Sequence, residues 1–278
     1  MTITPSHKLK SHFELKWNPF LPSLPNESLY GDGDLELFFW RVEQIASEGG
    51  FAMVTGDSGT GKSCTLRVIR DKLAKNPNTS VCLIDRPQSR IRDFYREMAT
   101  LYGIPLQVTN RYGSFQRLRE QWLALTNSHA FRPVLIIDEA QEMHEETLAE
   151  LRILGSTDLD ARCILSVVFA GDRRLAAKLE SPTLLPLKSR IRARIDLGNR
   201  DATEMRALLD HLLNEAGNPH IMTEPVKKAL ADQCANNSRV LATLGQELLL
   251  HAYIKGKKVV DEELYFDLHR GNSKKRRS

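Results

Sequence analysis

Short runs of consecutive apolar residues alternate with helix-like patterns between residues 51 and 197. The runs predict five strands, at 51–55, 80–84, 133–137, 163–170 and 193–197. Between them, apolar residues recur at helical spacing and predict helices near 62–75, 90–102, 114–127, 145–154 and 175–179. A further helix is expected before the first strand, with Leu35, Phe38 and Val42 on one face and Gly49 at its end. Strands that are apolar throughout and joined by helices predict a parallel sheet buried on both faces.

The pattern changes after residue 200, where only helices are predicted. They lie near 202–216, 224–236, 239–255 and 261–269. Asp201 and Thr223 are suited to cap the first two of these helices, and Gly217 is suited to end the first. We therefore expect four parts: a flexible N-terminus at 1–16, an α/β core at 17–199, a small helical domain at 200–269 and a basic tail at 270–278.

A glycine-rich run, GDSGTGKS, directly follows the first predicted strand and leads into a predicted helix. Its glycines allow loop conformations that a Cβ would penalise, so backbone N–H groups can surround phosphate oxygens at the helix N-terminus. Lys62 supplies a positive charge for the β- and γ-phosphates, and the Ser63 hydroxyl is placed to coordinate Mg²⁺. The motif predicts a site for ATP and Mg²⁺ with contacts from Gly56, Asp57, Ser58, Gly59, Thr60, Gly61, Lys62, Ser63 and Cys64.

Two carboxylates, Asp138 and Glu139, end the apolar run at 133–137. Acidic residues at the carboxyl end of a parallel strand lie beside the phosphate-binding loop in folds of this type. We expect Asp138 to hold Mg²⁺ through water. We expect Glu139 to orient and polarise the attacking water, as general base or as positioner. The loop and the acidic pair together predict ATP hydrolysis.

Composition and charge limit the class of protein. The chain has 278 residues, of which 41% are hydrophobic and 27% charged, as in ordinary soluble globular proteins. No apolar run approaches the ~20 residues of a membrane span, and the N-terminus lacks the apolar segment of a signal peptide, so we expect a cytoplasmic protein. The four cysteines are scattered and do not predict a disulfide set or a zinc site. The net charge of +4 permits binding to nucleic acid.

An adjacent Asp–Glu pair in a phosphate-loop protein with a C-terminal helical domain resembles the AAA+ superfamily of ATPases. The resemblance implies a core with a five-stranded parallel sheet and helices on both faces, followed by a small α-helical lid. Asp172 matches the position of the first sensor residue, where the superfamily usually has asparagine, serine or threonine. Arg239, at the start of a lid helix, matches the second sensor residue, which reaches back toward the γ-phosphate.

The run LKSRIRARIDL resembles the AAA+ segment that offers an arginine to the nucleotide of a neighbouring subunit. Arg190 matches that arginine best, and Arg192 and Arg194 are alternates. An arginine there would neutralise charge that develops in the transition state.

Longer stretches narrow the resemblance to one group, the ExeA-like ATPases together with the transposition regulators of the TnsC, TniB and Mu B type. They are WNPF, LIDRPQSRIRDFYREMATLYGIP and the lid from TEPVKKAL to VVDEE, and the match covers about Trp17 to Asp267. The NNSR before the helix predicted at 239–255 departs from the relatives, which usually have a glycine–proline pair before the arginine. ExeA-type proteins continue with a membrane segment and a wall-binding domain, whereas this chain ends after the lid, so we expect the transposition branch.

That branch implies an ATPase that binds duplex DNA without sequence preference and assembles on it as a ring or helical filament. The implied partners are a DDE transposase, which it recruits or activates, and a target-selection protein. The alternative is an ExeA-like ATPase of secretion assembly that works without DNA. A helicase or clamp loader is disfavoured because the chain is short.

Basic residues after the second strand and around the next helices are expected to contact DNA phosphates in a salt-sensitive way. The candidates are Arg86, Arg90, Arg92, Arg111 and Arg119. Phe115 and Trp122 share helical spacing with leucines, so we expect them in the core rather than stacked on bases. We expect the tail at Lys274–Arg277 to be disordered in the isolated protein.

Overall fold

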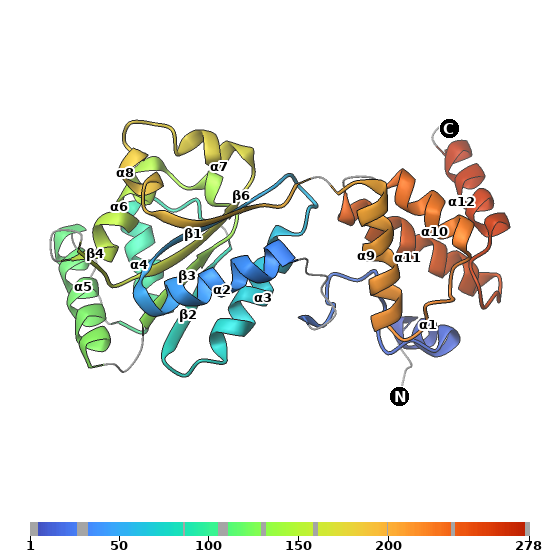
Figure 1. Ribbon diagram of the computed structural model, residues 1–278, viewed down its shortest axis with the longest axis horizontal. Helices are drawn as coiled ribbons and strands as arrows, with labels where there is room; N and C mark the ends of the chain where they lie inside the picture. Colours follow the sequence, from blue (N-terminus) through green and yellow to red (C-terminus); the bar gives the residue numbers. More distant parts are fainter. Residues whose placement is uncertain are drawn as a thin grey trace. The chain divides into compact units, whose positions relative to one another are not determined.

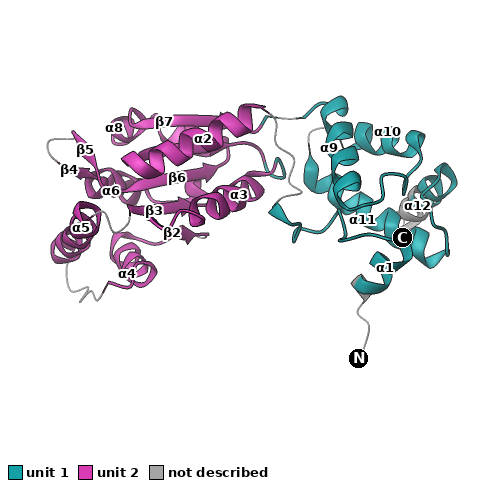
Figure 2. Cartoon of the chain, turned by 60° about the horizontal axis from the view of Figure 1, so that its bottom comes forward, with its two compact units in different colours: residues 1–30, 58–60, 198–278 teal, residues 31–57, 61–197 magenta. Residues whose placement is uncertain are grey.

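A computed structural model describes residues 5–26, 33–85, 87–104, 111–128, 132–157, 161–198, 200–234 and 237–275. The chain divides into two compact units, which are coloured separately in Figure 2. We call residues 31–57 and 61–197 the sheet unit, and residues 1–30, 58–60 and 198–278 the helical unit.

The sheet unit contains a five-stranded parallel sheet with the strand order β2-β3-β6-β1-β7. Its strands are β1 (Gly50–Thr55), β2 (Thr79–Ile84), β3 (Arg132–Ile137), β6 (Ser166–Gly171) and β7 (Ile191–Asp196). Because all five strands are parallel, their carboxyl ends meet at one edge, which is where the glycine-rich loop and the acidic pair begin. The predicted α/β fold with a five-stranded parallel sheet is confirmed.

Helices cover both faces of this sheet (Figure 1). They are α2 (Gly33–Glu48), α3 (Lys62–Ala74), α4 (Ile91–Leu101), α5 (Arg111–Asn127), α6 (Glu145–Gly155), α7 (Arg173–Lys178) and α8 (Leu185–Lys188), with the 3-10 turn η2 (Ala140–Glu142). Neighbouring residues of a strand point to opposite faces. Accordingly, Val134 and Ile136 pack with α2 and α3, whereas Leu135 and Ile137 pack with α4, α5 and α6. Trp122 is buried and Phe115 packs against the same core cluster, as predicted.

The predicted strand at 163–170 is divided in the structure. Its first residues form β5 (Arg162–Cys163), which pairs antiparallel with β4 (Ser156–Thr157), and only β6 joins the main sheet. The Ile164 N–H donates to the Gly155 carbonyl at 2.8 Å, which directs the chain away from the sheet. Apolar character alone does not separate the two segments, because Ile164 and Leu165 between them are also buried.

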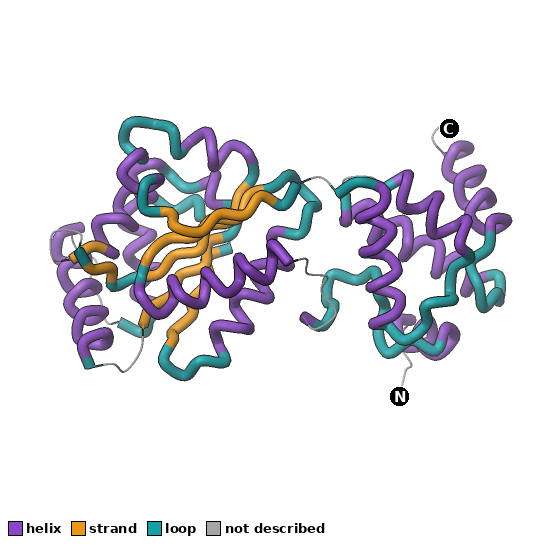
Figure 3. The backbone as a smooth tube through the Cα atoms, viewed as in Figure 1, coloured by secondary structure: helices purple, strands orange, loops and turns teal. Residues whose placement is uncertain are grey.

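The helical unit contains α9 (Ala202–Glu215), α10 (Glu224–Gln233), α11 (Ser238–Ile254) and α12 (Glu262–Lys275), the long helices drawn as purple tube in Figure 3. Asp201 and Glu204 form a reciprocal capping box at the start of α9. Gly217 follows the end of α9 with φ +96°, the left-handed conformation expected of a terminating glycine. Thr223 precedes α10 without a capping bond from its side chain.

The chain's N-terminal region differs from the predicted flexible segment at 1–16. Residues Pro5–Phe13 form helix α1, and Leu9, Phe13 and Leu15 are buried in the core of the helical unit. The Lys16 N–H donates to the Ala216 carbonyl at 2.9 Å, which ties this region to the end of α9. The error arose because α1 is short and otherwise polar, so its apolar side has only two positions.

The predicted core boundary at residue 17 also differs from the structure, since residues 1–30 group with the helical unit. Asn18 Nδ2 donates to Gln246 Oε1 at 2.6 Å, and the Phe20 ring lies against Gly245. At the other end, α12 extends to Lys275 and includes Lys274, which we expected to be disordered. Lysine has good helix propensity, so the helix that Asp261 caps can continue through Lys274. Arg276 and Arg277 lie outside the described residues.

Within the described part of the chain, no helix combines the length and apolar character needed to cross a lipid bilayer.

Candidate nucleotide site

The glycine-rich loop joins β1 to α3 and has the backbone expected of a phosphate-binding loop. Gly59 and Gly61 have φ values of +88° and +110°, where an L-residue with a side chain would be strained. Gly61 caps α3, and no side chain caps the first turn of that helix. The first N–H groups of α3 are therefore available to an anion such as phosphate.

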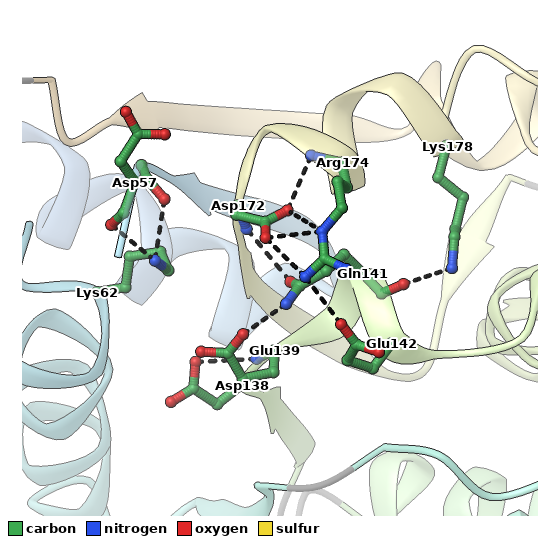
Figure 4. Close-up of polar contacts among 10 residues, drawn as sticks. Asp57, Lys62, Asp138, Glu139, Gln141, Glu142, Asp172, Arg174 and Lys178 are labelled. Atoms are coloured by element: carbon green, nitrogen blue, oxygen red, sulfur yellow. Dashed lines mark hydrogen bonds and ion pairs between the residues drawn. The ribbon is translucent and has the colours of Figure 1, made fainter. Parts of the chain in front are cut away.

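Lys62 lies inside the curve of this loop (Figure 4). Its Nζ donates to the carbonyl oxygens of Gly56 at 2.9 Å and Asp57 at 3.0 Å, and the residue is 7% exposed. A buried ammonium group needs such partners to offset its lost hydration. The loop therefore holds a fixed positive charge of the kind that attracts the β- and γ-phosphates.

Ser63 and Asp138 bring the loop and the acidic pair together. Ser63 Oγ donates to Asp138 Oδ2 at 2.8 Å, although the two residues are 75 positions apart. A hydroxyl and a carboxylate suit Mg²⁺, which prefers oxygen ligands and keeps much of its water and phosphate coordination. The described residues contain no cluster of three or more His, Cys, Asp or Glu that could hold a metal ion by themselves. The donor set thus fits a magnesium ion that arrives with a nucleotide.

Glu139 lies directly after Asp138 in an unusual backbone conformation. Its φ and ψ are +51° and +39°, and Glu14 is the only other described non-glycine residue with a positive φ. Its carboxylate accepts a hydrogen bond from Gln141 Nε2. Gln141 is 5% exposed, and its Oε1 accepts from the Asp172 N–H at 3.2 Å. The sequence analysis missed Gln141, whose only local signal is an amide two residues after the acidic pair.

Asp172 follows β6 and caps α7 (Figure 4). Its carboxylate accepts from the Arg174 N–H at 2.8 Å and forms an ion pair with the Arg174 side chain, also at 2.8 Å. The hydrogen bond from Arg174 holds the pKa of Asp172 below its ordinary value of 3.8. The side chain that we predicted to sense nucleotide is thus engaged in a helix cap, and its neighbour Arg173 pairs with Asp57 of the loop at 2.9 Å.

Comparison with known proteins agrees with this geometry. Residues 44–179 match the family described as AAA domain. General secretion pathway protein A of Aeromonas hydrophila is 26% identical over 209 residues, which are 75% of this chain and 38% of that protein. This chain therefore spans well under half the length of that relative.

Solved structures share the fold of most of this chain. Cdc6p from Pyrobaculum aerophilum has a TM-score of 0.69 and 17% identity, covering 87% of this chain and 67% of that chain. The ORC1 protein of Aeropyrum pernix, solved in complex with DNA, has a TM-score of 0.65 and 17% identity, covering 91% and 68%. At these identities the likeness shows the fold alone.

Two of the candidate arginine fingers, Arg190 and Arg192, lie at the amino end of β7, beside Gly50 and Phe51 of β1. The third, Arg194, pairs with Met53 in the middle of the strand. Arg190 Nη1 donates to Ser156 Oγ at 2.9 Å. Arg192 pairs with Glu48 at 3.2 Å, and Arg194 Nη2 donates to the Lys188 carbonyl at 2.8 Å. The glycine-rich loop begins at the opposite end of β1, so Arg190 and Arg192 lie toward the far edge of the sheet from their own loop.

Arg239, the candidate second sensor, belongs to the helical unit, and so do loop residues 58–60. Arg239 Nη1 donates to Ser58 Oγ at 3.1 Å. Asn237 caps α11 and also donates to the Ser58 carbonyl at 3.4 Å. A Cβ at Gly59 would lie 2.3 Å from Asn237 Oδ1, so only glycine fits there. Asn237, which the sequence analysis did not select, therefore helps to bring Arg239 to the loop.

The remaining candidates of the loop lie as follows. Thr60 is buried and its carbonyl accepts from Arg200 Nη1 at 3.4 Å. Cys64 is half-buried in the first turn of α3, and its thiol is free.

The arginines predicted to contact DNA have different surroundings. Arg90 and Arg92, at the start of α4, are exposed and have no ion-pair partner among the described residues. Arg119 lies over the Phe115 ring at 5.8 Å. Arg111 instead binds the buried Glu150 through both Nε and Nη2, so its guanidinium is tied to α6. Arg86 lies outside the described residues.

Proposed function

We propose that this protein hydrolyses ATP and that bound nucleotide controls its assembly on duplex DNA. The observation that carries the ATPase part is the 2.8 Å bond between Ser63 Oγ and Asp138 Oδ2, which joins the glycine-rich loop to the acidic strand end. In this proposal Lys62 binds the β- and γ-phosphates, and Ser63 and Asp138 hold Mg²⁺, which neutralises phosphate charge when bound. Glu139 accepts the proton of the attacking water.

The position of Arg190 supports a role in a neighbouring subunit. It precedes β7 at the level of Gly50, whereas the loop begins after Thr55, the last of the six residues of β1. Six strand residues span about 20 Å, so Arg190 cannot reach the nucleotide of its own chain. An arginine that acts only between copies makes hydrolysis depend on self-assembly. Arg192, at the same end of β7, and Arg194, in the middle of the strand, are the alternates.

A substitution at Glu139 tests the ATPase part. Glu139→Gln removes the proton acceptor but keeps the shape, so turnover should fall by about 10²- to 10⁴-fold, while ATP affinity changes by less than about twofold. Phosphate release and nucleotide binding measure the two quantities. Glu120→Gln, the same change at an exposed position on α5, is the control. Normal turnover in Glu139→Gln would contradict the assignment.

Exposed arginines support the DNA part of the proposal. Arg90, Arg92 and Arg117 are exposed on α4 and α5 without an ion-pair partner among the described residues, so their charges are available to phosphates. The chain's net charge of +4 has the sign that such binding needs. The Aeropyrum pernix ORC1 protein, which shares the fold, was solved in complex with DNA. Contacts of this kind are independent of sequence.

The salt dependence of DNA affinity tests these contacts. DNA affinity falls with salt, and each lost phosphate contact makes the slope of log K against log salt shallower by about 0.9. The double variant Arg90→Ala with Arg92→Ala should therefore make the slope shallower by about 2, measured in the presence of a non-hydrolysable ATP analogue. Arg41→Ala with Arg70→Ala removes the same charge from α2 and α3 and should leave the slope unchanged. Equal slopes for the two double variants would place the DNA contacts elsewhere.

The proposed client is a DDE transposase, which the DNA-bound assembly recruits or activates, with a target-selection protein as further partner. Its support is the resemblance of WNPF and of the lid to transposition regulators. The test is strand transfer by a DDE transposase with and without this protein, and an absence of stimulation would reject the client.

A second candidate is an ATPase of secretion assembly that works without DNA. It is favoured by the 26% identity to General secretion pathway protein A of Aeromonas hydrophila. Electron microscopy of the protein with plain duplex DNA and an ATP analogue separates the two. Rings or filaments on the DNA support the first candidate. Nucleotide binding without any DNA association supports the second.

A further inference from the structure

Gln141 occupies the centre of the polar network behind the acidic pair (Figure 4). Its side chain touches neither the glycine-rich loop nor solvent to any extent, being 5% exposed. Instead it bridges two chain segments, the acidic end of β3 and the turn after β6. Buried amides are retained where both ends are satisfied, and here both ends are.

The bridge has a defined direction because one partner can only donate. The Asp172 backbone N–H points at the amide and needs an acceptor, so it binds Gln141 Oε1, at 3.2 Å. That contact leaves Nε2 facing Glu139, whose carboxylate accepts from it. A glutamine oriented the other way would leave two donors facing each other at Asp172 and two acceptors at Glu139.

Neighbouring groups hold Gln141 in place. Lys178 Nζ donates to the Gln141 carbonyl and to the Met143 carbonyl, the latter at 2.7 Å. A Cβ on Gly171 would lie 2.7 Å from Gln141 Oε1, so the glycine before Asp172 leaves the space that the amide fills. The side chain therefore has a fixed seat rather than a surface position.

Glu139 needs an external partner to keep its orientation. Its left-handed backbone is uncommon for a residue with a long side chain, and such conformations persist where the surroundings enforce them. Residue 139 is exposed, so little packing fixes its side chain. Gln141 Nε2 engages Oε2 and leaves Oε1 as the oxygen able to accept a proton.

We propose that Gln141 is a positioning residue for Glu139, which fixes the carboxylate that accepts the proton and couples it to the turn after β6. The proposal rests on the ATPase function proposed above. Because Asp172 begins α7 directly after this turn, a displacement of the turn would be passed through one amide to Glu139. The hydrogen bonds of Gln141 go to Glu139, Asp172 and Lys178 and not to the glycine-rich loop, so its loss should lower kcat and leave nucleotide affinity unchanged.

The first test is Gln141→Leu, which keeps the size of the side chain and removes both hydrogen bonds. One lost hydrogen bond to a charged group corresponds to about a 10- to 100-fold lower kcat, with the Kd for an ATP analogue within about twofold. Gln121→Leu, the same change at an exposed position on α5, is the control. An unchanged kcat, or a Kd weakened as much as kcat, would overturn the proposal.

The second test is Gln141→Glu, which separates positioning from folding by its pH profile. At neutral pH its carboxylate can still accept from the Asp172 N–H, but it cannot donate to Glu139 and repels it, so kcat should fall as in Gln141→Leu. At lower pH the two carboxylates share a proton, one can donate, and kcat relative to the unmodified protein should rise. A pH-independent ratio would mean that the loss is merely structural.

A measurement without turnover keeps this proposal distinct from the ATPase proposal. The Nε2 protons of Gln141 can be followed by NMR in protein with ¹⁵N-labelled glutamine. Glu139→Ala should shift them and speed their exchange with water, whereas Glu120→Ala should not. If the unmodified protein hydrolyses no ATP, the ATPase proposal fails, and an unshifted Gln141 signal in Glu139→Ala separately rejects the bridge.

Discussion

The candidate nucleotide site and the helical unit are encoded in the sequence in opposite ways. The site residues come from short continuous motifs, each attached to the carboxyl end of one buried strand, and a single bond from Ser63 to Asp138 joins the motifs. The core of the helical unit draws its residues from both ends of the chain. Phe13 and Phe20 pack with residues beyond Met205 in one cluster.

The difference teaches where substitutions should act. In the site, backbone geometry is set locally by glycines and strand ends, so side chains such as Lys62 can serve binding rather than folding. In the helical unit, the side chains that form the core also hold distant segments together. Changes in the first region should therefore remove function with the fold intact, and changes in the second should first cost stability.

The largest effect is expected from Phe13→Ala. Phe13 is 1% exposed, and truncating a buried phenylalanine costs about 3–5 kcal/mol. Hydrogen exchange should accelerate across α9, α10 and α11 and stay slow in the β-sheet. Lys8→Ala, on the exposed side of the same helix, should change stability by less than about 0.5 kcal/mol. Unchanged exchange in Phe13→Ala would mean that the first residues are dispensable, as a flexible N-terminus would be.

Lys62→Ala should have the opposite effect, a loss of ATP binding without a loss of stability in the helical unit. The ammonium group contributes charge-assisted bonds to phosphate, each worth about 1.5–3 kcal/mol, so ATP affinity should fall by about 100-fold. Calorimetric titration with an ATP analogue measures this, and exchange in the helical unit should not change. Lys75→Ala, exposed at the other end of α3, is the control. If Lys62→Ala unfolds the protein before binding is lost, the loop is not independent of the fold.

The parts that could be predicted from sequence are those whose signals are local. Apolar runs predicted the parallel sheet, and the glycine-rich loop with the acidic pair predicted that the two motifs lie together, as Ser63 and Asp138 do. These succeed because a buried strand and a phosphate-binding loop impose residue types over a few consecutive positions. The start of α9 was likewise predictable, because Asp201 and Glu204 are three residues apart.

The parts that could not be predicted depend on distant partners. The orientation of the Gln141 amide depends on the Asp172 N–H, 31 positions away, and the sequence around Gln141 does not reveal that donor. Asn237 is defined by its contact with Ser58, 179 positions away. Arg111 looked like a DNA contact because its charge is visible in sequence, whereas its buried partner Glu150 is not. The role of Arg190 stays a prediction, since it requires a second copy of the chain.

Gly245→Ala is expected to have a moderate effect and to sharpen the comparison. A Cβ there would lie 2.4 Å from the Phe20 ring, so the segment around Phe20 and α11 would have to separate. Overpacking of this kind costs about 1–3 kcal/mol. Urea denaturation should give the loss, and Gly198→Ala, with open space around its Cβ, is the control. When Gly245→Ala is combined with Phe20→Leu, the two losses of stability should be less than additive, because the smaller leucine side chain relieves the clash. Additive losses would disprove the contact.

The smallest effect is expected at Asp172, which lies in the candidate nucleotide site and also caps α7, so it bears on both function and stability. Asp172→Ala removes the cap and should cost about 1 kcal/mol at neutral pH. Since the hydrogen bond from Arg174 lowers the pKa of Asp172, the charged carboxylate stabilises the fold above pH 3.8, its ordinary pKa. That part is lost as the pH falls through the lower pKa of the folded state. The stability difference between Asp172→Ala and the unmodified protein, from urea midpoints, should therefore shrink below about pH 4. A difference that stays constant to lower pH would mean that the carboxylate acts as a cap without its charge.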